Sequence, residues 1–256
     1  NSEKGLAPAS NLKVVTSGAA LCLLGQDFRF QTKVFAGMNI LKGDILNSNL
    51  VITGSGDPTL GSARIKGSKN LEELCSEIYN TISELGIKRI TGNIIADDLL
   101  YERNPVPDYW HWIDIGNYYG AGTSAFTINE NSYELHLKPG KTPGDTSGIW
   151  GTTPPGVGLI FANSVTTGKE GSGDNGYIYS APFSELAYLR GTVPAGVDTF
   201  TISGSIPNPP LFFARYLRDY LERSGIKVLG EARIPDLREN IHYSQMKEIK
   251  TIQSPP

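Results

Sequence analysis

The chain has 256 residues, a formal net charge of -3 and 19% charged residues. A weakly acidic chain of this composition lacks the basic surface that nucleic acids bind, so we expect no nucleic-acid partner. No stretch reaches the roughly 18 to 20 apolar residues of a membrane-spanning helix, so we expect no transmembrane segment in this chain. The three histidines are scattered without ligand spacing, and we expect neither a metal nor another cofactor. The 29 glycines and 16 prolines predict many turns and a strand-rich fold.

The first predicted element is a helix over residues 10–24 that follows a short turn. It is apolar nearly all round, which is typical of a buried helix, and Gly25 is suited to end it. Ser10 and Lys13 lie one turn apart at its start, so their side chains share a helix face. An amine in apolar surroundings loses basicity and can take a proton from a hydroxyl, and backbone N–H groups at a helix start can stabilise an oxyanion. Ser10 and Lys13 are therefore candidates for a nucleophile and its base.

The Ser-x-x-Lys pattern alone is weak evidence, because it occurs three times in the chain. Ser224 stands at the end of an amphipathic helix, and Ser244 lies in a polar segment. Only Ser10 opens an apolar helix. This context favours Ser10 and Lys13 over the other two matches.

Short strands are predicted after this helix. Alternating residues over 28–34 indicate a half-buried strand, a hairpin turns at residues 42–44, and residues 49–53 predict a further strand. The glycine-rich segment 54–58 is interpreted as a turn, because no Gly-Lys-Ser/Thr follows it as in a phosphate-binding loop.

Residues 71–85 predict a second, amphipathic helix that ends at a glycine. Asn70 is its candidate N-cap, and Glu73 occupies the capping-box position. Cys75 in this helix and Cys22 in the first one are expected to be small buried side chains rather than the two halves of a disulfide.

A strand is predicted over residues 89–96, and Asp97 and Asp98 follow it. Two adjacent carboxylates could serve acid–base or metal chemistry, or they could mark an acidic strand end that leads into a loop, which we favour. Residues 105–122 predict an irregular segment rich in aromatic side chains. Alternating strands and turns over residues 125–205 predict an all-β module.

A third helix is predicted over residues 209–223, started by two prolines and apolar on one face. Strands are predicted over residues 226–234 and 249–252. No internal repeat is evident.

Residues 7–13 read Ala-Pro-Ala-Ser-Asn-Leu-Lys. They resemble the active-site motif of the penicillin-binding D-alanyl-D-alanine carboxypeptidases, most closely the low-molecular-mass class C group (peptidase family S13 type). Further segments are similar to sequences of this family and occur in the family's order, at residues 24–32, 54–60, 118–121, 124–125, 129–131 and 254–256. The resemblance therefore extends from end to end of the chain.

The resemblance implies an α/β multi-domain fold. The chain would be a fragment of a serine penicillin-binding (β-lactamase/transpeptidase-like) domain with an inserted α/β domain, which itself carries an inserted all-β domain. Residues 1–31 and 250–256 would belong to the catalytic domain, residues 32–120 and 206–249 to the inserted α/β domain, and residues 121–205 to the β-rich domain.

The resemblance also implies a function. The family members are serine-type D-Ala-D-Ala carboxypeptidases and endopeptidases, which act on peptidoglycan stem peptides through an acyl-enzyme and are inhibited covalently by β-lactams. Ser10 would be the nucleophile and Lys13 its base. Such a substrate implies an extracytoplasmic, periplasmic enzyme, and we expect a signal peptide that is missing from this chain.

Asp114 is a third candidate site residue. Residues 110–114 resemble the family's loop at the edge of the active-site cleft, where an aspartate faces the side chain of the substrate. The resemblance implies that Asp114 binds the free ammonium group of the stem peptide. An ordinary surface or loop-capping aspartate is the alternative.

Two further family motifs, Ser-x-Asn and Lys-Thr-Gly, would follow the insertions, and the sequence ends before them. Ser-Lys-Asn at residues 68–70 and Lys-Thr-Pro-Gly at residues 141–144 imitate them, but they fall in a helix cap and a turn. We therefore expect this fragment alone to be inactive, with its first helix loose or packed against a substitute surface. A non-catalytic peptidoglycan-binding or scaffold protein with a vestigial serine is the main alternative. A β-lactamase is a weaker one, because insertions of this size argue against it.

Overall fold

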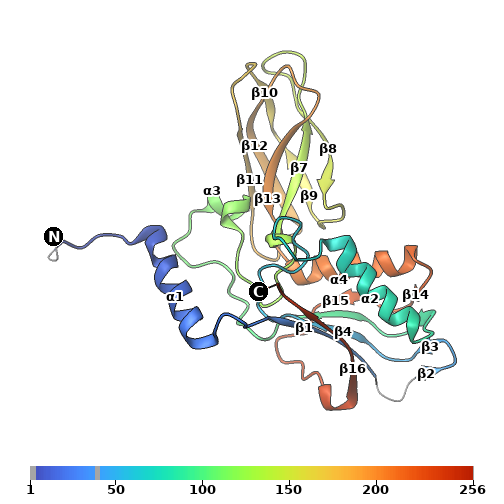
Figure 1. The fold of residues 1–256 in the computed structure, drawn as a ribbon. Coiled ribbons are helices and arrows are strands. Elements are labelled where there is room, and N and C mark those ends of the chain that lie inside the picture. The colour runs from blue at the N-terminus through green and yellow to red at the C-terminus, as the bar shows by residue number, and fades with distance from the viewer. Residues whose placement is uncertain (1–3, 38–40, 256) are drawn as a thin grey trace.

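The structure, a computed structural model, describes residues 4–37 and 41–255. Three parts are visible in Figure 1: a mixed α/β body, an elongated strand module that projects from it, and a helix near the N-terminus that stands away from both. No helix in the described part of the chain is long and apolar enough to cross a membrane. The combination of helices and sheets agrees with the expected α/β class.

The body is built on a five-stranded sheet. Its strands lie in the order β15 (Ala232–Arg233), β6 (Ile94–Asp97), β4 (Leu50–Thr53), β1 (Gln31–Gly37) and β16 (Met246–Gln253). Strand β1 is antiparallel to both of its neighbours, whereas β4, β6 and β15 run parallel to one another. The inner strands β4 and β6 are buried along most of their length, which explains their continuous apolar sequences. Strand β1 buries every second side chain, as its alternating sequence predicts, but it begins at Gln31 rather than at residue 28.

Helices α2 (Leu71–Glu84) and α4 (Pro209–Arg223) contact each other and pack on this sheet. Asn70 caps α2 in the predicted capping box, because its side chain and the Glu73 carboxylate each accept a hydrogen bond from the other's backbone N–H. Asn208 caps α4 by accepting a backbone hydrogen bond at 3.2 Å. Each helix buries one apolar face, as predicted.

A second, small sheet follows the order β14 (Lys227–Val228), β5 (Arg89–Ile90), β3 (Ile45–Leu46) and β2 (Leu41–Lys42). The hairpin of β2 and β3 is the predicted one. Ile40, which the pattern also assigns to its first strand, lies outside the described residues. The single strands predicted over residues 89–96 and 226–234 are wrong, because each segment forms two short strands in different sheets. Gly92 and Gly230 permit this crossing: a Cβ atom at either position would lie 2.2 to 2.3 Å from a backbone oxygen.

The projecting module contains two sheets. In one, β7 (Ser132–Lys138) lies between β8 (Gly148–Thr153) and β13 (Phe200–Ser205). In the other, β12 (Leu186–Pro194) pairs with β9 (Ile160–Asn163), β10 (Thr166–Gly168) and β11 (Asn175–Ser180). Their buried apolar residues include Leu135, Leu137, Ile178, Leu189 and Ile202. Strands fill this part of the chain as expected, but the sequence pattern does not predict β12, the longest, since its glycine and proline are typical of turns.

The chain passes from body to module near η2 (Tyr118–Gly120) and η3 (Asn129–Asn131), and it returns from β13 directly into α4. Residues 250–253, which the predicted division assigns to the catalytic domain, pair with residues 31–34 in the main sheet. The division of the chain into three nested domains stays a prediction.

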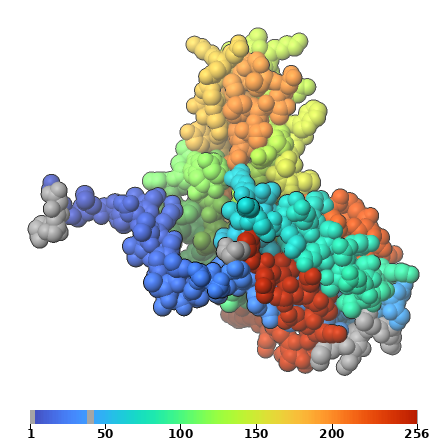
Figure 2. Space-filling view, viewed as in Figure 1, coloured from blue at the N-terminus to red at the C-terminus, as the bar shows by residue number. Residues whose placement is uncertain are grey.

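The N-terminal helix differs from its prediction in its surroundings. Segments η1 (Ala9–Asn11) and α1 (Leu12–Leu24) occupy the predicted residues, and Gly25, with a φ of 83°, ends α1. The burial that the apolar sequence predicts is wrong, because no residue of α1 is buried; the expectation of a loose first helix in this fragment agrees with this exposure. The helix lies at the edge of the molecule in Figures 1 and 2. Cys22 is therefore exposed, whereas Cys75 is buried as predicted, and both are free thiols. Apolar side chains favour burial only where other groups pack against them, and nothing in the described part of the chain covers α1.

Candidate active site

Ser10 and Lys13 meet at the start of α1. Lys13 Nζ donates a hydrogen bond to Ser10 Oγ at 3.2 Å, which confirms the contact predicted from their spacing. The Asn11 N–H bonds to the Pro8 carbonyl oxygen at 3.0 Å and closes the turn that presents Ser10. Ala9, directly before the serine, has a φ of 45°, a left-handed value that is unfavourable for a residue other than glycine. Such strain is concentrated at functional sites in proteins.

The surroundings of this pair do not supply the expected enclosure. Both side chains are exposed. The depression around them is lined by η1 and α1 alone, through Ala9, Ser10, Leu12, Lys13, Thr16 and Ser17. The expectation that apolar groups surround the Lys13 amine is therefore wrong for this structure. The roles of nucleophile and base stay predictions.

Asp114 lies on α3 (Trp112–Ile115), a short helix that packs against the module strand β11. The Asn117 side chain anchors α3, because it donates to the Ile113 carbonyl at 2.6 Å and accepts from the Ile178 N–H of β11 at 3.2 Å. His111, the N-cap residue of α3, makes no side-chain cap hydrogen bond. Substrate binding and an ordinary surface or loop-capping role remain the two interpretations of Asp114.

Aromatic side chains cluster on α3 and on the segment that follows it. The rings of Tyr118 and Tyr119 pack edge to face with centroids 5.3 Å apart, and Trp112 contacts Tyr179 of β11 at 6.3 Å between ring centroids. Burial raises the pKa of Tyr119, and the negative charge of Asp114 raises it further. Sequence reasoning misses Tyr179, because a strand far along the chain carries it and only the fold brings it to α3.

The structure brings two of the three predicted site residues together and places the third elsewhere. Asp114 does not line the depression around Ser10 and Lys13. Figure 1 shows α1 and α3 as separate elements on the same flank of the molecule.

Asp97 and Asp98 have different structural partners. Asp98 is 4% exposed and pairs with Arg103, whose Nε donates to it at 2.8 Å. Asp97 accepts hydrogen bonds from the Leu99 N–H at 2.9 Å and from the Tyr243 hydroxyl. Burial and the charge of Asp97 raise the pKa of Tyr243, so the phenol stays protonated and donates. These contacts support the interpretation as a strand end rather than as a pair acting on one substrate or metal.

The two segments that resemble the Ser-x-Asn and Lys-Thr-Gly motifs have local structural roles. Asn70 caps α2, and the Thr142 N–H donates to the Asp145 carboxylate at 2.9 Å in the turn after β7. The glycine-rich segment 54–58 is a turn as well, in which Asp57 accepts from the Thr59 N–H at 2.8 Å.

Over residues 1–256 the sequence matches a family of peptidases. The chain belongs to this family, the D-Ala-D-Ala carboxypeptidase 3 (S13) family, which confirms the resemblance seen in its motifs. It is 26% identical over 234 residues to a D-alanyl-D-alanine carboxypeptidase of an Actinomadura species. It is 23% identical over 252 residues to the D-alanyl-D-alanine carboxypeptidase DacB of Haemophilus influenzae. These matches cover 88% and 92% of the chain but only 41% and 47% of the two relatives, so the chain spans less than half of their length.

The fold is similar to that of penicillin binding protein 4 (dacB) from Haemophilus influenzae. The TM-score is 0.75 at 21% identity, and the match covers 97% of this chain and 51% of that one. A structure of the same protein complexed with a β-lactam matches with a TM-score of 0.67 at 21% identity, over 96% of this chain and 49% of the other. At this level of identity the likeness establishes the mixed α/β fold.

Proposed function

We propose that this chain forms part of a serine-type D-Ala-D-Ala carboxypeptidase and endopeptidase that acts on peptidoglycan stem peptides in the periplasm. The observation that carries the proposal is the 3.2 Å hydrogen bond between Lys13 and Ser10 at the start of a helix, in a chain of the S13 family. The proposal concerns a protein that also contains the part of the relatives' length that this chain does not span.

In the proposed reaction, Ser10 Oγ attacks the carbonyl carbon between the two D-alanines, and its proton passes to the Lys13 amine. The Ser10 backbone N–H contributes to the oxyanion hole. The peptide C–N bond breaks, the leaving D-alanine takes the proton, and the stem peptide remains as an ester on Ser10. Water hydrolyses this ester and regenerates the serine. β-Lactams would acylate the same oxygen and act as covalent inhibitors.

The exposure of the pair indicates what this chemistry still requires. A lysine amine acts as a base near neutral pH when apolar or cationic neighbours disfavour its protonated form. The apolar surface of α1 is where such neighbours would pack. We propose that the segments with the Ser-x-Asn and Lys-Thr-Gly motifs supply this enclosure, and that the 256 residues alone turn over no D-alanyl-D-alanine peptide.

The same exposure favours a second candidate function. A Ser–Lys pair on a helix without an enclosing cleft is compatible with a vestigial serine in a non-catalytic protein that binds peptidoglycan or acts as a scaffold. The two candidates differ in one property, because only the enzyme forms a covalent adduct on Ser10.

Covalent labelling by a fluorescent penicillin separates the two candidates. In a protein that includes the remaining catalytic segments, Ser10→Ala should abolish the labelled band, and Lys13→Ala should slow labelling by orders of magnitude. The double variant should be little worse than Ser10→Ala, because nucleophile and base act as a unit. Ser17→Ala is the matched control, since Ser17 lines the same depression. Undiminished labelling of the Ser10→Ala protein would exclude the proposed nucleophile.

A further inference from the structure

Asn117, the second residue after α3, joins the helix that carries Asp114 to the strand module. Asn117 is only 5% exposed. Its Nδ2 donates to the Ile113 carbonyl at 2.6 Å and to the Ile178 carbonyl at 3.4 Å, and its Oδ1 accepts from the Ile178 N–H at 3.2 Å. One buried amide therefore bonds to α3 and to β11 at the same time.

The bonds to Ile178 lie along a sheet edge. Strand β11 stands at the end of its sheet, and the outward N–H and C=O groups of an edge strand need partners other than a further strand. The Asn117 amide presents one donor and one acceptor to Ile178, as the backbone of a further strand would. This pairing fixes both the distance and the direction from which α3 approaches the module.

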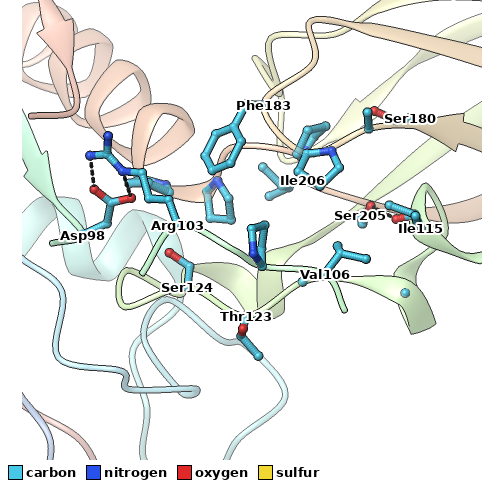
Figure 3. Close-up of a pocket in the computed structure, with 18 of the residues that line it drawn as sticks. Asp98, Arg103, Val106, Ile115, Thr123, Ser124, Ser180, Phe183, Ser205 and Ile206 are labelled. Atoms are coloured by element: carbon cyan, nitrogen blue, oxygen red, sulfur yellow. Dashed lines mark hydrogen bonds and ion pairs between the residues drawn. The ribbon is translucent and has the colours of Figure 1, made fainter. Parts of the chain in front are cut away.

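The other sheet of the module holds the same segment through β13. The Ser205 hydroxyl donates to the Ile115 carbonyl at 2.6 Å, and Figure 3 shows these two residues beside each other. The Ser205 N–H donates to the Gly116 carbonyl at 3.0 Å. Residues 113–117 are therefore bonded to both sheets of the module.

Gly116 permits this close attachment. A Cβ atom at this position would lie 2.1 Å from the Ile178 carbonyl oxygen, so a side chain there would push the segment away from β11. Buried backbone groups that lose their partners cost free energy, and a shift of α3 along the module would break several of these bonds together. The module therefore determines where Asp114 lies.

The position of Asp114 matters for its proposed role. Asp114 is partly exposed on this attached segment, and in the proposed function its carboxylate binds the ammonium group of the stem peptide. A charge-assisted hydrogen bond of this kind requires a distance of about 2.7–2.9 Å. A misplacement of about 1 Å can cost roughly 100-fold in rate.

We infer that Asn117 is a positioning residue for substrate selection, assisted by Ser205. Both residues act through α3, which they hold so that Asp114 meets the ammonium group. The strand module thereby contributes to the choice of substrate without touching the reacting bond. This inference rests on the proposed function and on the proposed role of Asp114.

The test compares two peptides in a protein that includes the remaining catalytic segments. The measured quantity is the ratio of kcat/KM for the amine-bearing peptide to kcat/KM for its N-acetylated analogue. Asn117→Ala should lower this ratio by roughly 10-fold or more, because it releases α3 from β11. Adding Asn117→Ala to Asp114→Asn should lower the ratio no further, since a residue that acts only through Asp114 has no effect once that carboxylate is gone.

Two more variants separate positioning from a general loss of structure. Ser205→Ala removes one side-chain bond to α3 and leaves its backbone bond, so it should lower the ratio by a smaller factor, about 2- to 5-fold. Asn163→Ala is the matched control. The Asn163 amide also bonds to module backbone, donating to the Ser147 carbonyl at 2.6 Å and accepting from the Val165 N–H at 3.0 Å. Its removal should leave the ratio unchanged.

Covalent labelling by penicillin reports on Ser10 separately in the same proteins. The inference is overturned if Asn117→Ala and Ser205→Ala keep the preference of the unaltered protein, or if Asn163→Ala loses as much of it. It is also overturned if the losses of Asn117→Ala and Asp114→Asn add in the double variant. An unaltered protein that labels with penicillin but does not distinguish the two peptides would refute the role of Asp114, and this inference with it. An unaltered protein that does not label would refute the proposed function itself.

Discussion

Helix α4 buries Phe212, Phe213, Leu217 and Leu221 in the body, whereas helix α1, of similar length, buries none of its residues. Their composition does not explain the difference, since α1 is apolar nearly all round and α4 is apolar on one face only. Helix α4 packs on β6 and β15 and contacts α2, but α1 has no such neighbour in the described part of the chain. An apolar sequence can therefore specify a helix without specifying its burial, which depends on a partner surface elsewhere.

The candidate site residues also differ in whether tertiary contacts hold them in place. Asp114 lies on a helix that Asn117 anchors to β11, so its position relative to the module is set by tertiary contacts. Ser10 and Lys13 are held only by the local geometry of η1 and α1. We expect substitutions to separate these regions in the following order of effect.

The largest effect is expected from truncating the buried face of α4. Phe213 is fully buried and its ring packs against Phe126 with centroids 5.1 Å apart. Phe213→Ala should lower the free energy of unfolding by about 3–5 kcal/mol. Leu23→Ala on α1 should change it by less than about 0.5 kcal/mol, because Leu23 is 84% exposed. Urea unfolding of the 256-residue chain measures both values.

Equal losses in the two variants would show that α1 is covered in solution and would contradict the exposed helix. The experiment also sharpens the proposed function. In a protein with the remaining catalytic segments, Leu23→Ala should cost about 2–5 kcal/mol if those segments pack on α1.

The next largest effect is expected at Asp114, the candidate site residue on the anchored helix α3. If Asp114 binds the ammonium group of a stem peptide, the charge-assisted hydrogen bond is worth about 1.5–3 kcal/mol. Asp114→Asn should then lower kcat/KM for the amine-bearing peptide by roughly 10- to 100-fold in the active protein. The N-acetylated peptide and penicillin acylation should be almost unaffected.

This comparison distinguishes binding from structure. An equal loss on the amine-bearing and acetylated peptides would indicate that Asp114 only supports α3. No loss on either substrate would remove Asp114 from the site.

The sequence alone is sufficient to predict structure that depends on local contacts. The bounds of α4, the capping box of α2 and the Ser10–Lys13 contact all follow from residues within one or two helical turns of each other. Prediction from the sequence fails where the structure of one segment depends on contacts with a distant segment. The sequence pattern places Gly92 inside one continuous strand. In the structure the chain passes there from one sheet to the other, and a distant backbone oxygen lies where a side chain would be.

The candidate sites follow the same rule. The pattern of residues 6–25 contains what is needed to predict a Ser–Lys contact, but it contains nothing about what covers α1. Tyr179 lies on β11, far along the chain from α3, and only the fold brings its ring to Trp112. The sequence around Tyr179 predicts a strand but does not predict this contact.

A smaller effect is expected from the helix caps. The Asn208 side chain accepts a hydrogen bond from the backbone of α4, whereas Asn11 at the start of α1 caps no backbone group with its side chain. Asn208→Ala should therefore lower the free energy of unfolding by about 1 kcal/mol. Asn11→Ala should leave it unchanged in urea unfolding, and an equal loss would show that α1 contributes to the cooperative unit.

The smallest effect depends on pH and concerns α2, which ion pairs connect to the sheet. Glu77 of α2 lies 2.8 Å from Lys250 of β16 and 3.0 Å from Lys69. Burial alone would raise the pKa of Glu77, but the hydrogen bonds and charges of the two lysines outweigh burial and lower it. A carboxyl whose pKa is lower in the folded state stabilises that state above its unfolded pKa of about 4.3. This stabilisation is lost as the pH falls from there through the folded value.

Glu77→Gln should therefore lower the free energy of unfolding by up to about 1 kcal/mol at pH 7, since partly exposed ion pairs are screened by water. The difference from the unaltered chain should shrink as the pH falls below the unfolded pKa and through the lower folded pKa of Glu77, because the protonated carboxyl resembles the glutamine. Glu84→Gln, at the exposed end of the same helix, is the control and should leave the free energy of unfolding nearly unchanged in urea at pH 7. A loss for Glu77→Gln that does not shrink in acid would indicate that Glu77 acts through packing. The ion pairs to Lys250 and Lys69 would then not be what distinguishes α2 from the unanchored α1.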